Sequence, residues 1–155
     1  MSFKKNKYCV VKKAIPNNLA EFLTKYFLLK RKVARKLFDS TYISEFTPEW
    51  GIWNDAQAPD TYSHYADIAM ETLLDSLKPL MEKETNLELV PTYSYARIYK
   101  TGDILKRHID RESCEISTTL NLGGDHWDIY LEPSGKKNMK GIKINLNQGD
   151  MLIYK

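Results

Sequence analysis

The sequence has few of the residues that crosslink or anchor a protein. Among its 155 residues are only two cysteines, Cys9 and Cys114, which lie far apart and in no metal-ligand spacing, so a disulfide scaffold and a zinc ribbon are excluded. No apolar run approaches the ~20 residues that span a bilayer. The basic start is followed by a short apolar stretch, residues 8–11, which is no signal-peptide core. We therefore expect a soluble, cytoplasmic protein that does not act at a membrane.

A large excess of one charge is also missing. Lysine and arginine number 23 and aspartate and glutamate number 20, so the net charge of +3 is too small to indicate nucleic-acid binding. Apolar residues make up 43% and charged residues 28%, which is close to the globular average and excludes wholesale disorder. The length predicts one domain over residues 1–155, because a chain of this size buries one core.

The first half of the chain has helical patterns. A short strand is predicted at residues 8–15, and Pro16 ends it. Apolar spacing then predicts a helix from Leu19 to about residue 37 and a second helix from residue 60 or 61 to 85. Between them, residues 39–59 are predicted to form a long loop packed down by its own aromatic side chains, with a substrate lid as the alternative. The aromatic residues of this loop include Tyr42, Phe46, Trp50 and Trp53.

The first predicted helix is basic in its second half, where Lys30, Arg31, Lys32, Arg35 and Lys36 follow one another closely. Cations suit the C-terminal end of a helix because the helix dipole is negative there. We interpret these residues as a solvated face, with a docking patch for an anionic partner as the alternative.

The second half has strand patterns. Extended segments are predicted at residues 92–99, 104–110, 116–122, 126–131, 142–146 and 151–154, with 126–131 pairing back on 116–122. Helices followed by a run of short strands are typical of an α+β fold with a sandwich or barrel in its second half. The alternation in the first segment predicts Tyr93, Tyr95, Arg97 and Tyr99 on one face. The last strand is expected to have an unpaired edge.

Two of the three histidines occur in His-x-Asp triplets, His108 to Asp110 and His126 to Asp128. On a strand, positions i and i+2 point to the same side, so such a triplet directs an imidazole and a carboxylate at one point. This mixed donor set suits ferrous iron. Because short triplets also arise by chance, each can equally be a hydrogen-bonded surface histidine. We interpret the second triplet, which contains the large Trp127, as packing, and favour the first as the metal site.

The surroundings of His108 resemble a known enzyme family. Residues 95–110 are similar to the prolyl 4-hydroxylase-like branch of the 2-oxoglutarate and Fe(II)-dependent oxygenases, in which a tyrosine, a glycine turn and a His-x-Asp pair recur with this spacing. Residues 117–124 resemble the family's next strand with its Gly-Gly turn, and residues 149–154 resemble a later Gly-Asp turn and strand. The resemblance covers about residues 88–155, and residues 1–87 match only as helical support. It implies a double-stranded β-helix (jelly-roll) core with N-terminal supporting helices.

The resemblance implies roles for four residues. His108 and Asp110 would be two iron ligands, and the Tyr99 hydroxyl would donate to a carboxylate of 2-oxoglutarate. Arg97 occupies the place of a co-substrate contact, since a cation suits a dicarboxylate. The alternatives are a core strand tyrosine for Tyr99 and a structural ion pair for Arg97. The cofactors implied are Fe(II), 2-oxoglutarate as co-substrate and O2, with ascorbate as an optional addition.

The resemblance also implies an activity, that of a dioxygenase that hydroxylates a substrate and releases succinate and CO2. A prolyl residue in a peptide or protein is the first candidate substrate, a small molecule is another, and nucleic acid is a distant second to a peptide. The family's third ligand, a histidine after the Gly-Asp strand, and the basic residue beyond it that binds 2-oxoglutarate have no counterpart before Lys155. We therefore expect one or more C-terminal strands to be missing. A third ligand from His64 or His126 would break the family pattern, and a non-catalytic jelly-roll binding module or inactive relative is the alternative function.

Overall fold

The computed structural model describes residues 2–44, 47–136 and 138–155. Its helices are α1 (Phe3–Asn6), α2 (Asn17–Asp39) and α3 (Ile68–Thr85), with 3-10 turns η1 (Pro48–Trp50) and η2 (Glu112–Cys114). Its strands are β1 (Tyr8–Val11), β2 (Tyr62–Tyr65), β3 (Tyr95–Ile98), β4 (Ser117–Leu120), β5 (Ile129–Leu131), β6 (Ile142–Ile144) and β7 (Met151–Tyr154). The predicted α+β class is confirmed.

The chain divides into two compact units, and each is described by itself. Unit 1 comprises Met1–Thr24, Leu77–Val90 and Asp110–Lys155, and unit 2 comprises Lys25–Ser76 and Pro91–Ile109. None of the helices in the described ranges is long and apolar enough to cross a membrane. The interpretation of residues 1–155 as one domain stays a prediction.

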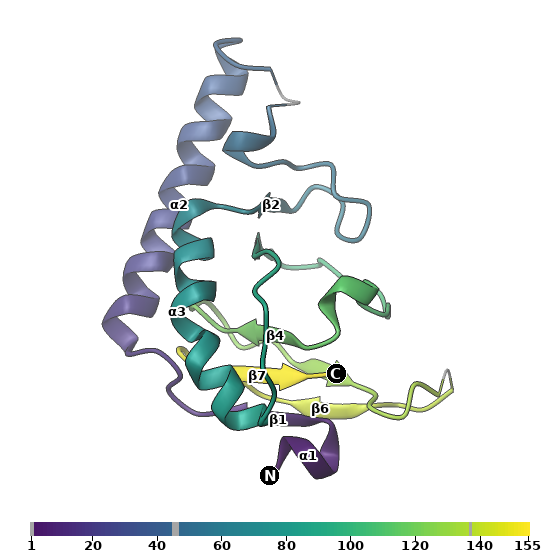
Figure 1. Cartoon of the computed structure of the whole chain (residues 1–155). Helices are drawn as coiled ribbons and strands as arrows, with labels where there is room; N and C mark the ends of the chain where they lie inside the picture. Colours follow the sequence, from purple (N-terminus) through teal and green to yellow (C-terminus); the bar gives the residue numbers. More distant parts are fainter. Residues whose placement is uncertain (1, 45–46, 137) are drawn as a thin grey trace. The chain divides into compact units, whose positions relative to one another are not determined.

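Unit 1 contains a three-stranded antiparallel sheet in the order β1-β7-β4, with β7 between its two neighbours (Figure 1). Ile153 of β7 pairs with Cys9 of β1 on one side and with Thr118 of β4 on the other. The prediction that the last strand has an unpaired edge is therefore wrong. The sequence-distant strand β1 supplies the missing partner, and the apolar run Met-Leu-Ile in β7 is fully buried, as expected of a central strand.

A second, two-stranded sheet of unit 1 pairs β5 with β6, with Tyr130 opposite Lys143. The prediction that residues 126–131 pair back on residues 116–122 is wrong, because this segment pairs forward across the polar loop that follows it. Tyr8 and Leu152 of the first sheet form one buried cluster with Ile144 and Leu146. Unit 1 thus buries apolar side chains between antiparallel strands, while the double-stranded β-helix arrangement stays a prediction.

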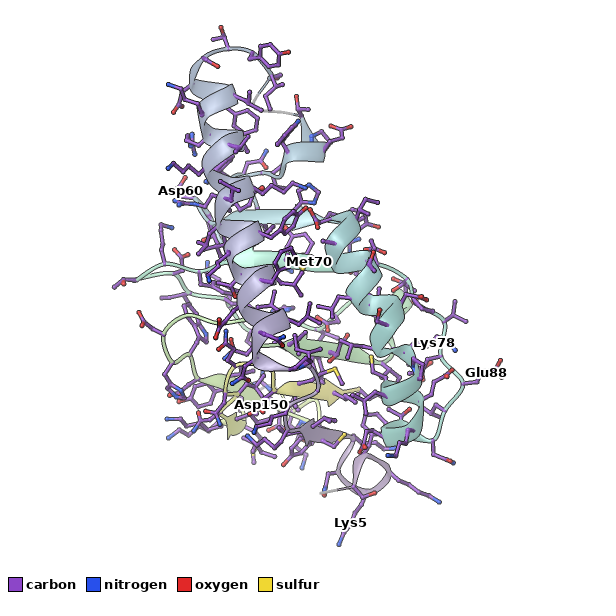
Figure 2. All side chains as sticks on the ribbon, turned by 90° about the vertical axis from the view of Figure 1, so that its left-hand side faces the viewer. Lys5, Asp60, Met70, Lys78, Glu88 and Asp150 are labelled. Atoms are coloured by element: carbon purple, nitrogen blue, oxygen red, sulfur yellow. The ribbon has the colours of Figure 1, made fainter. Side chains whose placement is uncertain are left out.

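The turn before β7 is held by Asp150, which is labelled in Figure 2. Its buried carboxylate accepts hydrogen bonds from the backbone N–H groups of Lys13 (3.0 Å) and Asn147 (2.9 Å) and from the Lys12 ammonium (2.7 Å). Burial alone would raise the pKa of Asp150, but these hydrogen bonds lower it below its usual value. The carboxylate therefore ties the turn to the segment after β1.

Gly149 in this turn has φ +81°, and a Cβ there would lie 2.6 Å from the carbonyl oxygen of Ile15. We expect Gly149→Ala to lower the free energy of unfolding by about 2–4 kcal/mol, because backbone strain and a clash with rigid backbone add together. Gly124→Ala is the matched control, since Gly124 also has positive φ but open space around it. Urea unfolding of both variants checks this, and an equal loss in the two would contradict the steric argument.

Unit 2 contains an antiparallel pair of strands, β2 and β3, in which Ser63 lies opposite Arg97. The prediction that the second helix begins at residue 60 or 61 is therefore wrong, because residues 62–65 form β2. Pairing with β3 overrides local preference here. Ala66 has positive φ and turns the chain, and Asp67 then caps α3 by accepting hydrogen bonds from the N–H groups of Ala69 and Met70.

The loop at residues 39–59 is packed down in unit 2 through Trp53. Its ring centroid lies 4.7 Å from that of Tyr62 and 5.3 Å from that of Phe38, and the Arg35 guanidinium lies 4.0 Å from the ring. Trp53 thus packs as the packing interpretation predicts, but its partners lie outside the loop, and the prediction is wrong for Tyr42, which is 80% exposed. Phe46, which belongs to the same prediction, lies outside the described residues.

Two segments differ from the prediction in local structure. Residues 104–110, predicted as extended, form no strand. The argument that positions i and i+2 of a strand point to the same side therefore does not apply to His108 and Asp110. The short helix α1 was not predicted, since only one of its residues, Phe3, is apolar and buried. Lys5 points outward from α1 (Figure 2).

Candidate functional site

The candidate site begins with one face of β3 in unit 2. Because side chains alternate along a strand, Tyr95 and Arg97 share a face, and Tyr99 just beyond the strand continues it. The Arg97 guanidinium lies 4.8 Å from the ring centroid of Tyr95 and 5.7 Å from that of Tyr99. The tyrosines and the arginine are therefore in contact, with the cation stacked between aromatic faces.

Arg97 also forms a nearly buried ion pair. Its Nη2 donates to the Asp55 carboxylate and, at 3.1 Å, to Gln57 Oε1, while both partners of the ion pair have side chains only 11% exposed. Its Nη1 donates to the Tyr99 hydroxyl at 3.0 Å. Of the two interpretations of Arg97, this geometry matches the structural ion pair. The predicted contact with a co-substrate stays a prediction.

The Asp55 carboxylate is the centre of this cluster. It accepts a hydrogen bond from the Tyr95 hydroxyl at 2.7 Å and from the backbone N–H of Gln57 at 2.8 Å. Burial would raise the pKa of Asp55, but these bonds and the Arg97 cation lower it below its usual value. Burial and the Asp55 hydrogen bond raise the pKa of Tyr95. At neutral pH the cluster therefore holds an ionised Asp55 carboxylate, the Arg97 guanidinium and a neutral Tyr95 phenol.

The turn after Tyr99 is fixed by Asp103. Its carboxylate accepts hydrogen bonds from the Lys100 backbone N–H (2.9 Å), the Lys100 ammonium (2.5 Å) and the Thr61 hydroxyl (2.5 Å). Burial would raise the pKa of Asp103, but these bonds lower it to about 2. The predicted glycine turn between Tyr99 and the His-x-Asp triplet is thus an ordered feature of unit 2.

His108 is exposed and has one orienting hydrogen bond. Its Nδ1 lies 2.8 Å from the carbonyl oxygen of Lys106. Because a carbonyl only accepts, His108 Nδ1 is the donor of this hydrogen bond. Histidines that bind metals commonly donate their other ring N–H to such an oxygen. The contact of His108 Nδ1 with a backbone carbonyl is therefore of the kind that metal-binding histidines make.

Asp110 belongs to unit 1 and is described there. Its Oδ2 accepts a hydrogen bond from the Tyr154 hydroxyl at 2.9 Å. Burial raises the pKa of Tyr154, and the negative charge of Asp110 raises it further. Tyr154 therefore stays protonated and keeps donating to the carboxylate, as second partners of metal-binding carboxylates do.

The other two histidines have different environments. His126 Nε2 lies 2.7 Å from Asp128 Oδ1, and the Lys143 ammonium contacts the other carboxylate oxygen at 2.6 Å. These residues lie on the surface, and Trp127 between them is 40% exposed, so the interpretation of this triplet as packing is wrong. His64 is buried on β2, with its Nε2 donating to the Glu49 carbonyl at 2.8 Å. In the described ranges, no group of three His, Cys, Asp or Glu side chains could hold a metal ion.

Several residues of this site were not predicted from the sequence. Asp55 lies forty-two positions from Arg97, in a loop with no periodic pattern, so no local signal identifies the ion pair. Tyr154 reaches Asp110 from β7, whose position in the sheet the sequence did not reveal. An acidic partner for Arg97 could be expected from the sequence, but nothing distinguishes Asp55 from the other acidic residues, of which the chain has twenty in all.

Comparison with known proteins shows a similarity in fold. No protein-family model and no curated protein matches the sequence. A crystal structure of a prolyl-4-hydroxylase from Pseudomonas putida matches with a TM-score of 0.59 and 12% sequence identity, over 98% of this chain and 81% of that chain. At this identity the similarity concerns the fold alone. The chain therefore has a prolyl-4-hydroxylase-like α+β fold.

Proposed function

We propose that the chain is an Fe(II)- and 2-oxoglutarate-dependent dioxygenase domain that hydroxylates a substrate, with a prolyl residue in a peptide as the first candidate. The single observation that supports this most is the fold similarity to a prolyl-4-hydroxylase over nearly the whole chain. The ordered set of Tyr99, the glycine turn and the His-x-Asp triplet supports it independently, because fold similarity plays no part in that pattern.

The residues present fit part of an iron site. His108 Nδ1 donates to the Lys106 carbonyl, and Asp110 has a hydrogen-bonded carboxylate. A nitrogen and a carboxylate oxygen are donors that suit Fe(II). Iron, when bound, supplies the redox chemistry that the side chains cannot perform. The third ligand is not assigned to any residue of the described ranges.

The co-substrate residues fit a dicarboxylate. In the proposal, Arg97 and Tyr99 bind a carboxylate of 2-oxoglutarate through their N–H and O–H groups. The Nε of Arg97 is buried and has no hydrogen-bond partner among the described residues, so the guanidinium retains a donor beyond those that Asp55, Gln57 and Tyr99 use. The chain's own contribution is to bind and orient the co-substrate and to hold Arg97 protonated beside Asp55.

Metal binding tests this proposal directly. We expect the chain to bind Mn(II), a redox-stable stand-in for Fe(II), and His108→Ala to weaken binding by at least about tenfold, since a ligand is lost. His126→Ala is the matched control, because His126 is also exposed and stands in a His-x-Asp triplet. Calorimetric titration measures the affinities, and succinate formation with Fe(II) and 2-oxoglutarate measures the activity.

A non-catalytic binding module is the second candidate. The observation that favours it is the ion pair of Arg97 with Asp55, which already satisfies much of the guanidinium. Mn(II) affinity unchanged by His108→Ala, together with no succinate formation, would support the module and contradict the enzyme.

A further inference from the structure

The helix α2 has a second apolar stripe, and most of its residues are exposed. Its core face comprises Ala20, Leu23, Phe27 and Ala34, all buried. Leu19, Phe22, Tyr26, Leu29 and Val33 follow a different stripe with alternating spacings of three and four residues. This spacing is the a/d seam of a coiled coil. The protein therefore presents a seam suited to packing against another helix.

Most side chains of this seam are exposed to solvent, which indicates a surface that binds another helix. Phe22 is 66% and Leu29 60% exposed, and Leu19 and Val33 are also exposed at the two ends of the stripe. Tyr26 in the middle of the stripe is half-buried and donates to Asp67. Single exposed apolar residues are ordinary, but four of them at seam positions of one helix indicate an interaction surface.

Charge is concentrated beside the seam. The helix α2 contains six basic and two acidic side chains, so its net charge of +4 exceeds the +3 of the whole chain. With the seam at a and d, Lys25 and Lys32 occupy the g row that flanks it. The e row on the other flank faces the protein, since Leu23 is buried and Lys30 binds Asp67. The open flank is therefore basic.

This charge pattern selects the partner. In an antiparallel pair of two copies, g rows face each other, and in a parallel pair a g row faces an e row. In the antiparallel pair, Lys25 and Lys32 of one copy would meet the same lysines of the other, and like charges there oppose pairing. The parallel pair needs an open e row, but in this chain Leu23 is buried and Lys30 is paired with Asp67. We propose that α2 docks an acidic amphipathic helix of another protein, with apolar residues on its seam and glutamate or aspartate beside it.

Two synthetic peptides test the proposal with the full chain. Both have three heptads with leucine at a and d, and they carry either glutamate or lysine at e and g, so that self-repulsion keeps each peptide monomeric. We expect the glutamate peptide to bind at least about tenfold more tightly, measured by fluorescence anisotropy, and high salt to reduce the difference. Leu29→Ser should weaken binding about tenfold, because it removes a central apolar contact.

A charge reversal makes the test specific. Lys25→Glu/Lys32→Glu should reverse the preference in favour of the lysine peptide. Lys4→Glu/Lys5→Glu on α1 changes the net charge equally and should leave the preference unchanged. Equal binding of the two peptides, a stable dimer of the chain in sedimentation equilibrium, or binding to phosphatidylserine vesicles without peptide binding would each overturn the proposal.

Discussion

Replacing Asp67 with alanine is expected to lower the free energy of unfolding by about 3–5 kcal/mol, because the substitution leaves a nearly buried cation without its counter-charge. The Asp67 side chain is fully buried and pairs with Lys30, whose side chain is 16% exposed. The same carboxylate accepts a hydrogen bond from the Tyr26 hydroxyl at 2.8 Å and caps α3. One substitution therefore removes an ion pair, a hydrogen bond and a helix cap.

Urea unfolding of three variants measures this effect. In the Asp67→Ala background, Lys30→Met should recover part of the loss, since it removes the stranded cation. Asp39→Ala is the control, because its pair with Arg35 is exposed, with a separation of 4.0 Å, and should change stability by no more than about 0.5 kcal/mol. A loss from Asp67→Ala as small as that from Asp39→Ala would contradict the assignment of Asp67 as a central contact of unit 2.

The Asp67 contribution should also depend on pH. Burial would raise the pKa of Asp67, but the hydrogen bonds from Lys30 and Tyr26 lower it below its unfolded value of about 4. The unfolded chain then binds this proton more readily, so the stabilisation is present above about pH 4 and is lost as the pH falls through the folded pKa. The stability difference between the wild type and Asp67→Asn should therefore shrink below pH 4, and a difference that stays constant would contradict this linkage.

The sequence predicted those elements whose patterns are local. Apolar spacing from Leu19 onward predicted α2, and the alternation in residues 92–99 predicted β3 with Tyr95 and Arg97 on one face. It missed β2, because Tyr-Ser-His-Tyr is too short to outweigh the helical pattern that follows it. Pairing with β3, thirty residues later, decides the conformation there.

The candidate site shows the same limit. Residue types and spacing identified His108, Asp110, Tyr99 and Arg97, but the contacts that orient them come from distant positions. Asp55 reaches Arg97 from a loop, and Tyr154 reaches Asp110 from β7. Such pairings depend on sheet register and loop path, which a single sequence does not specify.

Asp55→Ala is expected to destabilise unit 2 by about 3–5 kcal/mol, because Arg97 loses its counter-charge in a nearly buried site. Arg97→Met should cost a similar amount, and the double variant less than the sum of both, since the two side chains act as one pair. Thermal and urea unfolding of the four proteins gives the coupling free energy. Additive losses would contradict a mutual ion pair.

The same variants separate the structural role of Arg97 from its proposed role toward 2-oxoglutarate. A carboxylate ligand and Asp55 compete for one guanidinium, so Asp55→Asn should increase the stabilisation by 2-oxoglutarate, measured as a shift of Tm. Arg97→Met should abolish that shift. If 2-oxoglutarate stabilises neither the wild type nor Asp55→Asn, the ion pair is the whole role of Arg97, because a released guanidinium beside Tyr99 would otherwise bind the dicarboxylate more tightly than the paired one.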